Sequence, residues 1–336
     1  MILHLDLEAN EYDIKIESGS LNDAGSFFDL DRKVLAVTDD GVPEDYVRTL
    51  MRHCRRGFVF SFPSGEKSKN FETLQAVLSE LIKNNFTRYD AVVAVGGGVV
   101  SDLAGLAAAL YMRGIDFYNI PTTLLAQADA SVGGKCAVDL NGIKNIAGVF
   151  YQPKAVLIDP DTLKTLPERH ISNGMAEIIK AALIRNAGLV EMIENTAVLD
   201  DPCEMITEAV KTKKEIVEQD EKEKGIRKIL NFGHTIGHAL ETVSEGKLLH
   251  GECVAVGMMY MSGPDVRKRL KGLLESYDLP ASCSFNREAL SDVIAHDKKC
   301  RMDFIDCIEV EKLGECHVKR MTLEELGALM DSYESP

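Results

Sequence analysis

Glu177 and Lys180 are the first residues whose types and spacing could serve catalysis. They lie three positions apart in NGMAEIIKAALI, so a helix places both on one face. A surface ion pair is the commonest result of that spacing. The apolar run at residues 181–184 instead indicates a buried helix, in which a carboxylate and an amine need partners that justify their burial.

A second group of polar residues contains histidines at metal-ligand spacing. His234 and His238, in NFGHTIGHAL, are four positions apart on one helix face, and glycines leave room beside them. The alternative interpretation is a core histidine with satisfied hydrogen bonds. His250 begins a later apolar helix and offers a third ligand, which with Glu177 and His234 would form an open zinc site. The sequence alone does not place these side chains next to one another.

The stretch AVVAVGGGVVSDLAG predicts a seat for a phosphate group. Residues 91–95 are a continuous apolar run, typical of a strand that is covered on both faces. Three glycines follow at 96–98, and a helix of small residues begins near Val100. Glycines allow a close approach, and the helix start offers free N–H groups to an anion. A tight strand-to-helix turn is the alternative, and the stretch lacks the GxGxxG dinucleotide fingerprint.

An anionic ligand would need a local cluster of cations, because the formal net charge is −15. Lys135 follows two glycines, and Lys144–Asn145 follows another, so we expect both in loops near the phosphate seat. The candidate cations are Arg113, Lys135, Lys144, Lys213, Arg227, Lys298 and Lys299.

These residues must be positioned by two kinds of architecture. Before residue 165, strands expected at 33–38, 57–62, 91–95, 116–120 and 154–159 alternate with helices at 44–55, 71–85 and from 100. This alternation predicts a doubly wound, largely parallel sheet that binds ligands at the carboxyl ends of its strands. After residue 169 nearly everything is expected to be helical, with helices at 176–185, 189–195, 202–218, 229–241, 250–260, 266–277, 287–297 and 323–332 and a small hairpin within 306–318. We therefore place a domain boundary between residues 163 and 167.

The composition narrows the class of protein. The chain has 336 residues, of which 45% are hydrophobic and 27% charged, as expected for a globular protein of two domains. The negative net charge and the lack of a long Lys/Arg run argue against a nucleic-acid partner. No apolar run approaches the roughly 20 residues of a membrane span. The first residues alternate like a strand, so we expect no signal peptide.

The cysteines indicate a reducing compartment. None of the eight forms a CxxC pair, so we expect reduced thiols and a cytoplasmic location. Cys300, Cys307, Cys316 and His317 are close in sequence, but their spacing matches no closed zinc site.

Eight motifs give the chain a specific resemblance to a known family. GGGVVSDLAG, MRG, PTTLLAQADASVGGK, KNIAGVFYQP, TLPER, GMAEIIK, LNFGHTIGHALE and HGE occur in the order and spacing typical of 3-dehydroquinate synthases. The resemblance extends from about Gly65 to Lys299. It implies a Rossmann-like, doubly wound α/β domain at 1–165 that binds NAD, followed by a mainly α-helical domain at 166–336 that binds the metal and the substrate.

The resemblance also implies an enzyme, a lyase of the shikimate pathway. Members bind NAD and a divalent metal, zinc or cobalt, and convert 3-deoxy-D-arabino-heptulosonate 7-phosphate to 3-dehydroquinate and phosphate. NAD oxidises a ring hydroxyl to a ketone, which acidifies the neighbouring C–H so that phosphate is eliminated. The hydride then returns, and an intramolecular aldol step closes the new ring.

Family roles are carried over motif by motif. The implied metal ligands are Glu177, His234 and His250. The implied substrate contacts are Asp129, Lys135, Lys180, Lys213, Arg227, Asn231, His238 and one of Lys298 and Lys299. The implied NAD contacts are Asp39, Glu66, Lys69, Gly97, Gly98, Val99, Asp102, Thr122, Thr123, Lys144, Asn145, Thr165 and Leu166. Arg113 matches an arginine that reaches the neighbouring subunit's site, which implies a homodimer.

The chain departs from the family pattern at a few positions. Gly41 stands where asparagine is usual, Ala130 where serine is common, and His170 where an acid is usual; the segment 262–280 is short. None of these positions is an implied metal ligand. The alternatives are a cyclase for another sugar phosphate, a metal-dependent polyol dehydrogenase, and a nucleotide-binding sensor without turnover. Asp129, Lys180 and Asn231 match the dehydroquinate type, as does Arg227.

Overall fold

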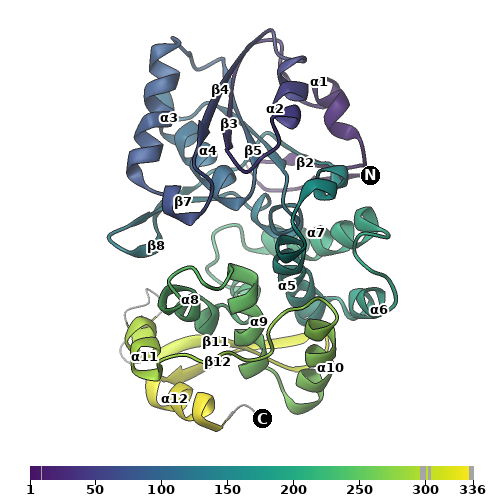
Figure 1. Ribbon diagram of the computed structural model, residues 1–336, viewed down its shortest axis with the longest axis vertical. Helices are drawn as coiled ribbons and strands as arrows, with labels where there is room; N and C mark the ends of the chain where they lie inside the picture. Colours follow the sequence, from purple (N-terminus) through teal and green to yellow (C-terminus); the bar gives the residue numbers. More distant parts are fainter. Residues whose placement is uncertain (9, 296–299, 302–303, 333–336) are drawn as a thin grey trace. The chain divides into compact units, whose positions relative to one another are not determined.

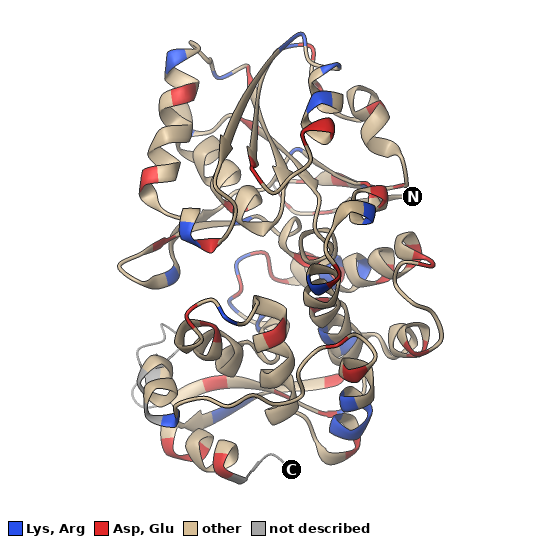
Figure 2. Cartoon of the chain, viewed as in Figure 1, with Lys and Arg blue, Asp and Glu red and all other residues tan. Residues whose placement is uncertain are grey.

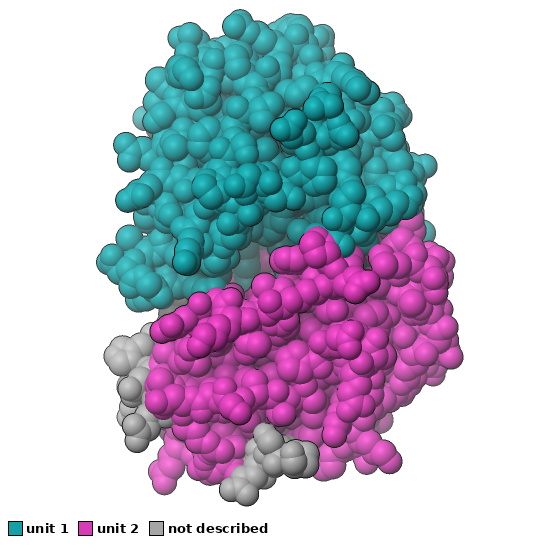
Figure 3. Space-filling model, viewed as in Figure 1, with its two compact units in different colours: residues 1–166 teal, residues 167–336 magenta. Residues whose placement is uncertain are grey.

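The backbone of the chain divides into two compact units. The computed structural model describes residues 1–8, 10–295, 300–301 and 304–332. Contacts within the backbone separate Met1–Leu166 from Pro167–Pro336 (Figure 3). Each unit has its own buried apolar residues and is described by itself.

A seven-stranded sheet forms the centre of the first unit (Figure 1). Its spatial order is β1 (Ile2–Leu5), β2 (Tyr12–Ile16), β9 (Ala155–Ile158), β6 (Asp116–Pro121), β5 (Ala91–Gly96), β3 (Lys33–Asp39) and β4 (Arg56–Phe62). Every neighbouring pair is parallel except β1 and β2. The prediction of a doubly wound, largely parallel sheet is confirmed.

Helices cover both faces of this sheet, which explains the unbroken apolar run of β5. Val92 and Ala94 pack with α3 (Phe71–Lys83) and α4 (Gly98–Leu110). Val93 and Val95 belong to the opposite layer, with η1 (Ser20–Asp23), α1 (Ala24–Phe27) and α2 (Glu44–Met51). Because successive strand residues point to opposite faces, each of the six residues of β5 is buried.

The expected loops around Lys135 and Lys144 are instead a β-hairpin. Lys135 opens β7 (Lys135–Leu140), and Lys144 and Asn145 lie within β8 (Ile143–Phe150). The turn is Asn141–Gly142, with φ of 52° and 79°, the backbone that Asn-Gly favours between two strands. Both positions of that turn could have been read from the sequence, and the loop prediction was wrong.

The second unit is mainly helical and also contains a three-stranded sheet. Its helices are α5 (Glu168–Arg185), α6 (Ala187–Asn195), α7 (Pro202–Gln219), α8 (His234–Val243), α9 (His250–Tyr260), α10 (Pro264–Glu275), α11 (Arg287–Ala295) and α12 (Leu323–Ser332). Strands β10 (Cys300–Arg301), β11 (Phe304–Lys312) and β12 (Glu315–Thr322) extend the small hairpin expected within 306–318. Residues 296–297, the expected end of α11, lie outside the described residues.

One expected helix of this unit is two elements. The stretch predicted as a helix at 229–241 consists of the 3-10 helix η6 (Ile226–Asn231) and α8, which begins at His234. Gly233 separates them with a φ of 76°, a left-handed conformation that glycine adopts without strain. His234 therefore lies in the first turn of its helix.

Charged residues of both signs are interspersed over both units (Figure 2). Within the described part of the chain, none of the helices combines the length and apolar character needed to cross a bilayer.

Candidate active site

A buried carboxylate–amine pair lies in the middle of α5. Glu177 and Lys180 are each 2% exposed, and the Lys180 ammonium donates a short hydrogen bond to Oε2 of Glu177. The pair is thus in the core of the second unit and is not a surface ion pair. Burial alone would raise the pKa of Glu177, but Lys180 and His250 hold that pKa below its usual range.

Two histidines face the other oxygen of this carboxylate. Oε1 of Glu177 lies 3.5 Å from Nε2 of His234 and 3.4 Å from Nε2 of His250. It is buried and accepts no hydrogen bond from any residue that the structure describes. His238 completes the group, since one nitrogen of each of the three histidines lies within 4.8 Å of the others. The three helices α5, α8 and α9 therefore converge on one polar centre.

In His234 and His250 the second ring nitrogen, Nδ1, lies beside a hydrogen-bond acceptor. Nδ1 of His234 lies 3.0 Å from the carbonyl oxygen of Phe232, and Nδ1 of His250 lies 3.1 Å from Oε2 of Glu241. Because both partners are acceptors, each Nδ1 carries the proton, and Nε2 of a neutral ring turns a lone pair toward Glu177. The lone pair of Nε2 and the carboxylate oxygen Oε1 repel each other, and a cation between them offsets this repulsion.

The chemistry of these atoms fits a divalent transition metal. Burial lowers the pKa of His250, but Glu177 and Glu241 outweigh this effect and raise the pKa to about 10, so a positive charge is favoured beside these carboxylates. Two imidazole nitrogens and one carboxylate oxygen suit zinc or cobalt and leave a coordination position open for substrate. His238 offers a third imidazole nitrogen in the same group.

Glycines bring the two histidine-bearing helices into close contact. A Cβ on Gly257 of α9 would lie 2.0 Å from the carbonyl oxygen of Gly233, and one on Gly237 would lie 3.1 Å from the backbone of Val254. The sequence suggested that glycines leave room beside His234 and His238. Instead, α9 fills the space beside Gly237, and this approach places His250 opposite His234.

Other residues predicted to contact the substrate lie on α7 and on the 3-10 helix η6, which pack against each other and against α5. Lys213 on α7 is 7% exposed and Arg227 on η6 is 1% exposed, so neither is part of a solvated face. Asn231 ends η6, and its Nδ2 donates to Oε1 of Glu223 at 2.5 Å. Lys298 and Lys299 lie outside the described residues.

The carboxyl edge of the first unit's sheet gathers many of the residues predicted to bind NAD. β3 ends at Asp39 and β5 at Gly96, and the N–H of Thr122 after β6 donates to the carbonyl of Gly96 at 2.9 Å. Thr123 follows, so these side chains share one edge. Burial raises the pKa of Asp39, although the Gly41 N–H, 2.9 Å from its Oδ1, opposes that shift.

The three glycines of the turn have different tasks. A Cβ on Gly96 would lie 2.5 Å from Val100, so packing of β5 against α4 requires this glycine. A Cβ on Gly97 or Gly98 would meet its nearest protein atom at 3.2 or 3.4 Å. Packing therefore excludes a side chain less strictly at Gly97 and Gly98 than at Gly96. These two positions adjoin the free N–H groups of Gly98 and Val99 at the start of α4. This arrangement fits a bound phosphate.

Five predicted NAD contacts form a single polar network. Nζ of Lys69, a residue only 6% exposed, lies 2.5 Å from Oδ2 of Asp102 and donates to Oδ1 of Asn145 at 2.5 Å. Glu66 and Lys144 form an adjoining ion pair at 3.6 Å. Burial lowers the pKa of Lys69, but Asp102 and Glu66 raise it above its usual range. The network joins η2 (Glu66–Ser68), α4 and β8.

Comparison with known proteins decides the family. Residues 59–173 match the model of the 3-dehydroquinate synthase N-terminal domain, and residues 174–300 match that of the C-terminal domain. The chain is 41% identical to the 3-dehydroquinate synthase of Clostridium acetobutylicum over 345 residues, covering 96% of this chain and 97% of the relative. The chain belongs to the 3-dehydroquinate synthase family. Another relative of that name, from Streptococcus suis, is 40% identical, covering 97% of this chain and 98% of the relative.

Solved structures of sugar phosphate cyclases share the fold of this 3-dehydroquinate synthase family member. A 2-deoxy-scyllo-inosose synthase complexed with carbaglucose-6-phosphate, NAD+ and Co2+ is similar with a TM-score of 0.89 at 25% identity, covering 99% of each chain. The 2-epi-5-epi-valiolone synthase of Streptomyces hygroscopicus, with NAD+ and Zn2+ bound, also gives a TM-score of 0.89, at 26% identity, covering 97% of this chain and 98% of that one.

Three further predicted residues lie on separate elements of the first unit. Asp129 lies on the π-helix η4 (Ala126–Ala130), Lys135 opens β7, and Thr165 ends η5 (Pro160–Thr165) with its Oγ1 2.8 Å from the hydroxyl of Tyr46. Arg113 is exposed and follows α4 in η3 (Tyr111–Arg113). The helix α4 therefore ends at Leu110, before Arg113.

The sequence did not reveal Glu241 or Asn173 as parts of this site. Glu241 fixes the ring of His250, and Oδ1 of Asn173 accepts a 2.6 Å hydrogen bond from the N–H of Gly251. Glu241 lies one turn after His238 within LNFGHTIGHALE, which was the only available signal for it.

A second group of potential metal ligands lies on β11 and β12. It comprises Glu309, Glu311 and His317 and is more exposed than the group around Glu177. Lys319 already pairs with Glu309 at 2.9 Å, which reduces the negative charge offered to a cation. Cys307 and Cys316, which are close to His317 in sequence, are free thiols.

Proposed function

We propose that this chain is a 3-dehydroquinate synthase that converts 3-deoxy-D-arabino-heptulosonate 7-phosphate to 3-dehydroquinate and phosphate. The observation that carries the proposal is the buried Oε1 of Glu177 facing two histidine Nε2 atoms. It occurs in a chain about 40% identical, over nearly its full length, to relatives of that name.

The structure supports a division of tasks within the second unit. Glu177, His234 and His250 would hold zinc or cobalt, which when bound would polarise the hydroxyl that is oxidised. Lys180 keeps Glu177 ionised and oriented through its hydrogen bond to Oε2. His238, whose ring centroid lies 5.2 Å from that of His234, would contact the substrate phosphate. Buried Lys213 and Arg227 would offset substrate charge.

The first unit would hold the cofactor. NAD would accept the hydride and return it, so that the reaction has no net redox change. Gly97, Gly98 and Val99 would bind its pyrophosphate, and Asp39 would accept from a ribose hydroxyl. The network of Lys69, Asp102 and Asn145 would line the same site, as would Glu66 with Lys144, Thr122, Thr123, Thr165 and Leu166.

Phosphate release without net NADH formation is the expected result of the central experiment. Purified protein receives NAD, Zn(II) or Co(II), and the heptulosonate phosphate, and both phosphate and absorbance at the NADH wavelength are followed. Each NAD should support many turnovers, because the hydride returns to the same molecule. Steady accumulation of NADH would instead favour a polyol dehydrogenase, and activity only on another sugar phosphate would favour a different cyclase.

We further propose a homodimer in which Arg113 contacts the neighbouring subunit's substrate. Met112 and Arg113 have φ of 50° and 66°, a conformation that costs free energy in residues other than glycine. Such strain at an exposed arginine is consistent with a requirement to present its side chain in one direction.

Mixing two inactive variants tests this shared site. An Arg113→Ala protein and a Lys180→Ala protein should each have little activity. After subunit exchange, mixed dimers carry one intact site, so roughly a quarter of wild-type activity should return at equal mixing of a symmetric dimer. Proven exchange with no recovery of phosphate release would refute the contribution of Arg113 across the interface.

The alternative functions, a cyclase for another sugar phosphate and a polyol dehydrogenase, receive less support. The cyclases of other sugar phosphates are only 25–26% identical to this chain. A probable glycerol dehydrogenase is 15% identical and shares the fold alone. A cytoplasmic location remains a prediction, supported by the seven free thiols among the described residues.

A further inference from the structure

Helices α5 and α9 are joined by three successive polar contacts that lead to the proposed metal site. The residues on α5 are Arg169, Asn173 and Glu177, each one turn beyond the last. Their partners are the first three residues of α9 in reverse order, Glu252, Gly251 and His250. Each advance of one turn along α5 toward Glu177 is therefore matched by a step of one residue back toward the first residue of α9.

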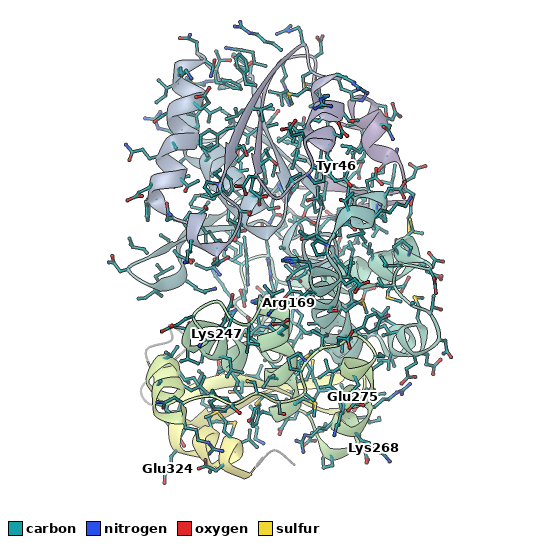
Figure 4. All side chains as sticks on the ribbon, viewed as in Figure 1. Tyr46, Arg169, Lys247, Lys268, Glu275 and Glu324 are labelled. Carbon is teal, nitrogen blue, oxygen red and sulfur yellow. The ribbon has the colours of Figure 1, made fainter. Side chains whose placement is uncertain are left out.

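The first contact is a bidentate ion pair. Nε and one terminal nitrogen of Arg169 donate to the two oxygens of Glu252 at 2.7 and 2.8 Å. The same terminal nitrogen donates to the carbonyl of Lys247 at 2.8 Å, and Figure 4 labels both residues. Oε2 of Glu252 also accepts from the N–H of Leu249 at 2.8 Å, so it caps α9. Arg169 therefore holds both the loop before His250 and the helix start that carries it.

The second contact allows no side chain between the helices. Asn173 accepts from the N–H of Gly251, and a Cβ on Gly251 would lie 2.0 Å from the carbonyl oxygen of Asn173. The two backbones are therefore in direct contact one turn before Glu177. This contact fixes the separation of Glu177 from His250, the third pair.

We propose that Arg169 and Asn173 are positioning residues that set the geometry of the metal site through Glu252 and Gly251. They do not touch the metal or the substrate. The proposal rests on the metal site put forward above. Partners of this kind typically change metal affinity by about 10- to 100-fold.

The test measures metal affinity and not turnover. Metal-free full-length protein is titrated with Co(II) against a competing chelator, and the visible absorption of bound Co(II) reports its coordination geometry. Arg169→Gln and Glu252→Gln should each weaken Co(II) binding by about tenfold or more and alter the spectrum. The double variant should lose little more than either single variant, because the pair acts as one unit.

A matched control exists on the same unit. Arg269 makes a bidentate pair with Glu194, with both contacts at 2.6 Å, on α10 and α6. Arg269→Gln should leave Co(II) affinity and spectrum unchanged. Arg169→Lys keeps the charge but not the bidentate geometry, and should give an intermediate affinity; it is measured alongside in case Arg169→Gln unfolds.

The outcomes separate this inference from the proposed function. Wild-type affinity and spectrum in the folded Arg169 and Glu252 variants would overturn the positioning role. If the wild-type protein itself binds no Co(II) at one ion per chain, the proposed metal site fails, whatever the variants do.

Discussion

Glu177→Gln is expected to abolish metal retention and to destabilise the metal-free protein. The carboxylate accepts a hydrogen bond from the buried Lys180 ammonium, and it also faces His234 and His250. Removing one partner of a buried pair costs about 3–5 kcal/mol, because the other charge stays buried. The loss of Lewis-acid assistance should lower phosphate release on the order of 1,000-fold. Metal content by elemental analysis, thermal unfolding and the phosphate assay measure the three effects.

The helix α7 offers a matched control for this variant. Glu208 and Lys211 have the same three-residue spacing, with a contact of 2.7 Å, but their side chains are 28% and 40% exposed. Glu208→Gln should therefore change stability by well under about 1 kcal/mol and leave one metal ion per chain. A Glu177→Gln protein that keeps its metal through purification would remove Glu177 from the set of ligands.

Asp102→Asn is expected to destabilise the first unit and to weaken NAD binding. Lys69 is 6% exposed, and its ammonium lies 2.5 Å from Asp102. Asparagine keeps the shape but removes the charge, so the cost should again be about 3–5 kcal/mol. Lys69 and Asn145 would lose their fixed positions, and we expect NAD affinity to fall roughly 10- to 100-fold. Calorimetric titration with NAD and thermal unfolding provide the measurements.

An exposed ion pair on the same unit serves as a control, because it carries the same charges without the burial. Asp45 contacts Arg48 at 2.7 Å on α2, but their side chains are 81% and 59% exposed. Asp45→Asn should have an effect below about 1 kcal/mol and leave NAD affinity unchanged. Equal effects of the Asp45 and Asp102 variants would show that the buried network contributes nothing specific to the cofactor site.

Local patterns predicted the elements well where one residue type dominated. The apolar run of β5 and the alternation of strands with helices yielded the parallel sheet, because strands buried on both faces need no polar positions. The β7–β8 hairpin was missed although Asn141–Gly142 marks it. The apolar neighbours of Lys180 correctly indicated burial.

The arrangement of the site depended on contacts between residues distant in sequence. Gly257 is needed because the carbonyl of Gly233 lies against it, and this becomes evident only when α8 and α9 are packed together. The same holds for Glu241, whose contact with His250 spans nine positions and a loop. Residue types suggested metal ligands, but no spacing rule could indicate which residues orient them.

Both α8 and α9 begin at a histidine that faces Glu177, His234 and His250 respectively, and the ring centroids of these histidines are 5.3 Å apart. Each helix start carries about half an elementary positive charge from its aligned peptide dipoles. Formal charge counting, which gives −15 for the chain, omits these partial charges. Two converging helix starts thus add positive partial charge at a site that also holds the Glu177 and Glu241 carboxylates. This partial charge favours oxyanions, and it favours the deprotonated form of any hydroxyl that binds there.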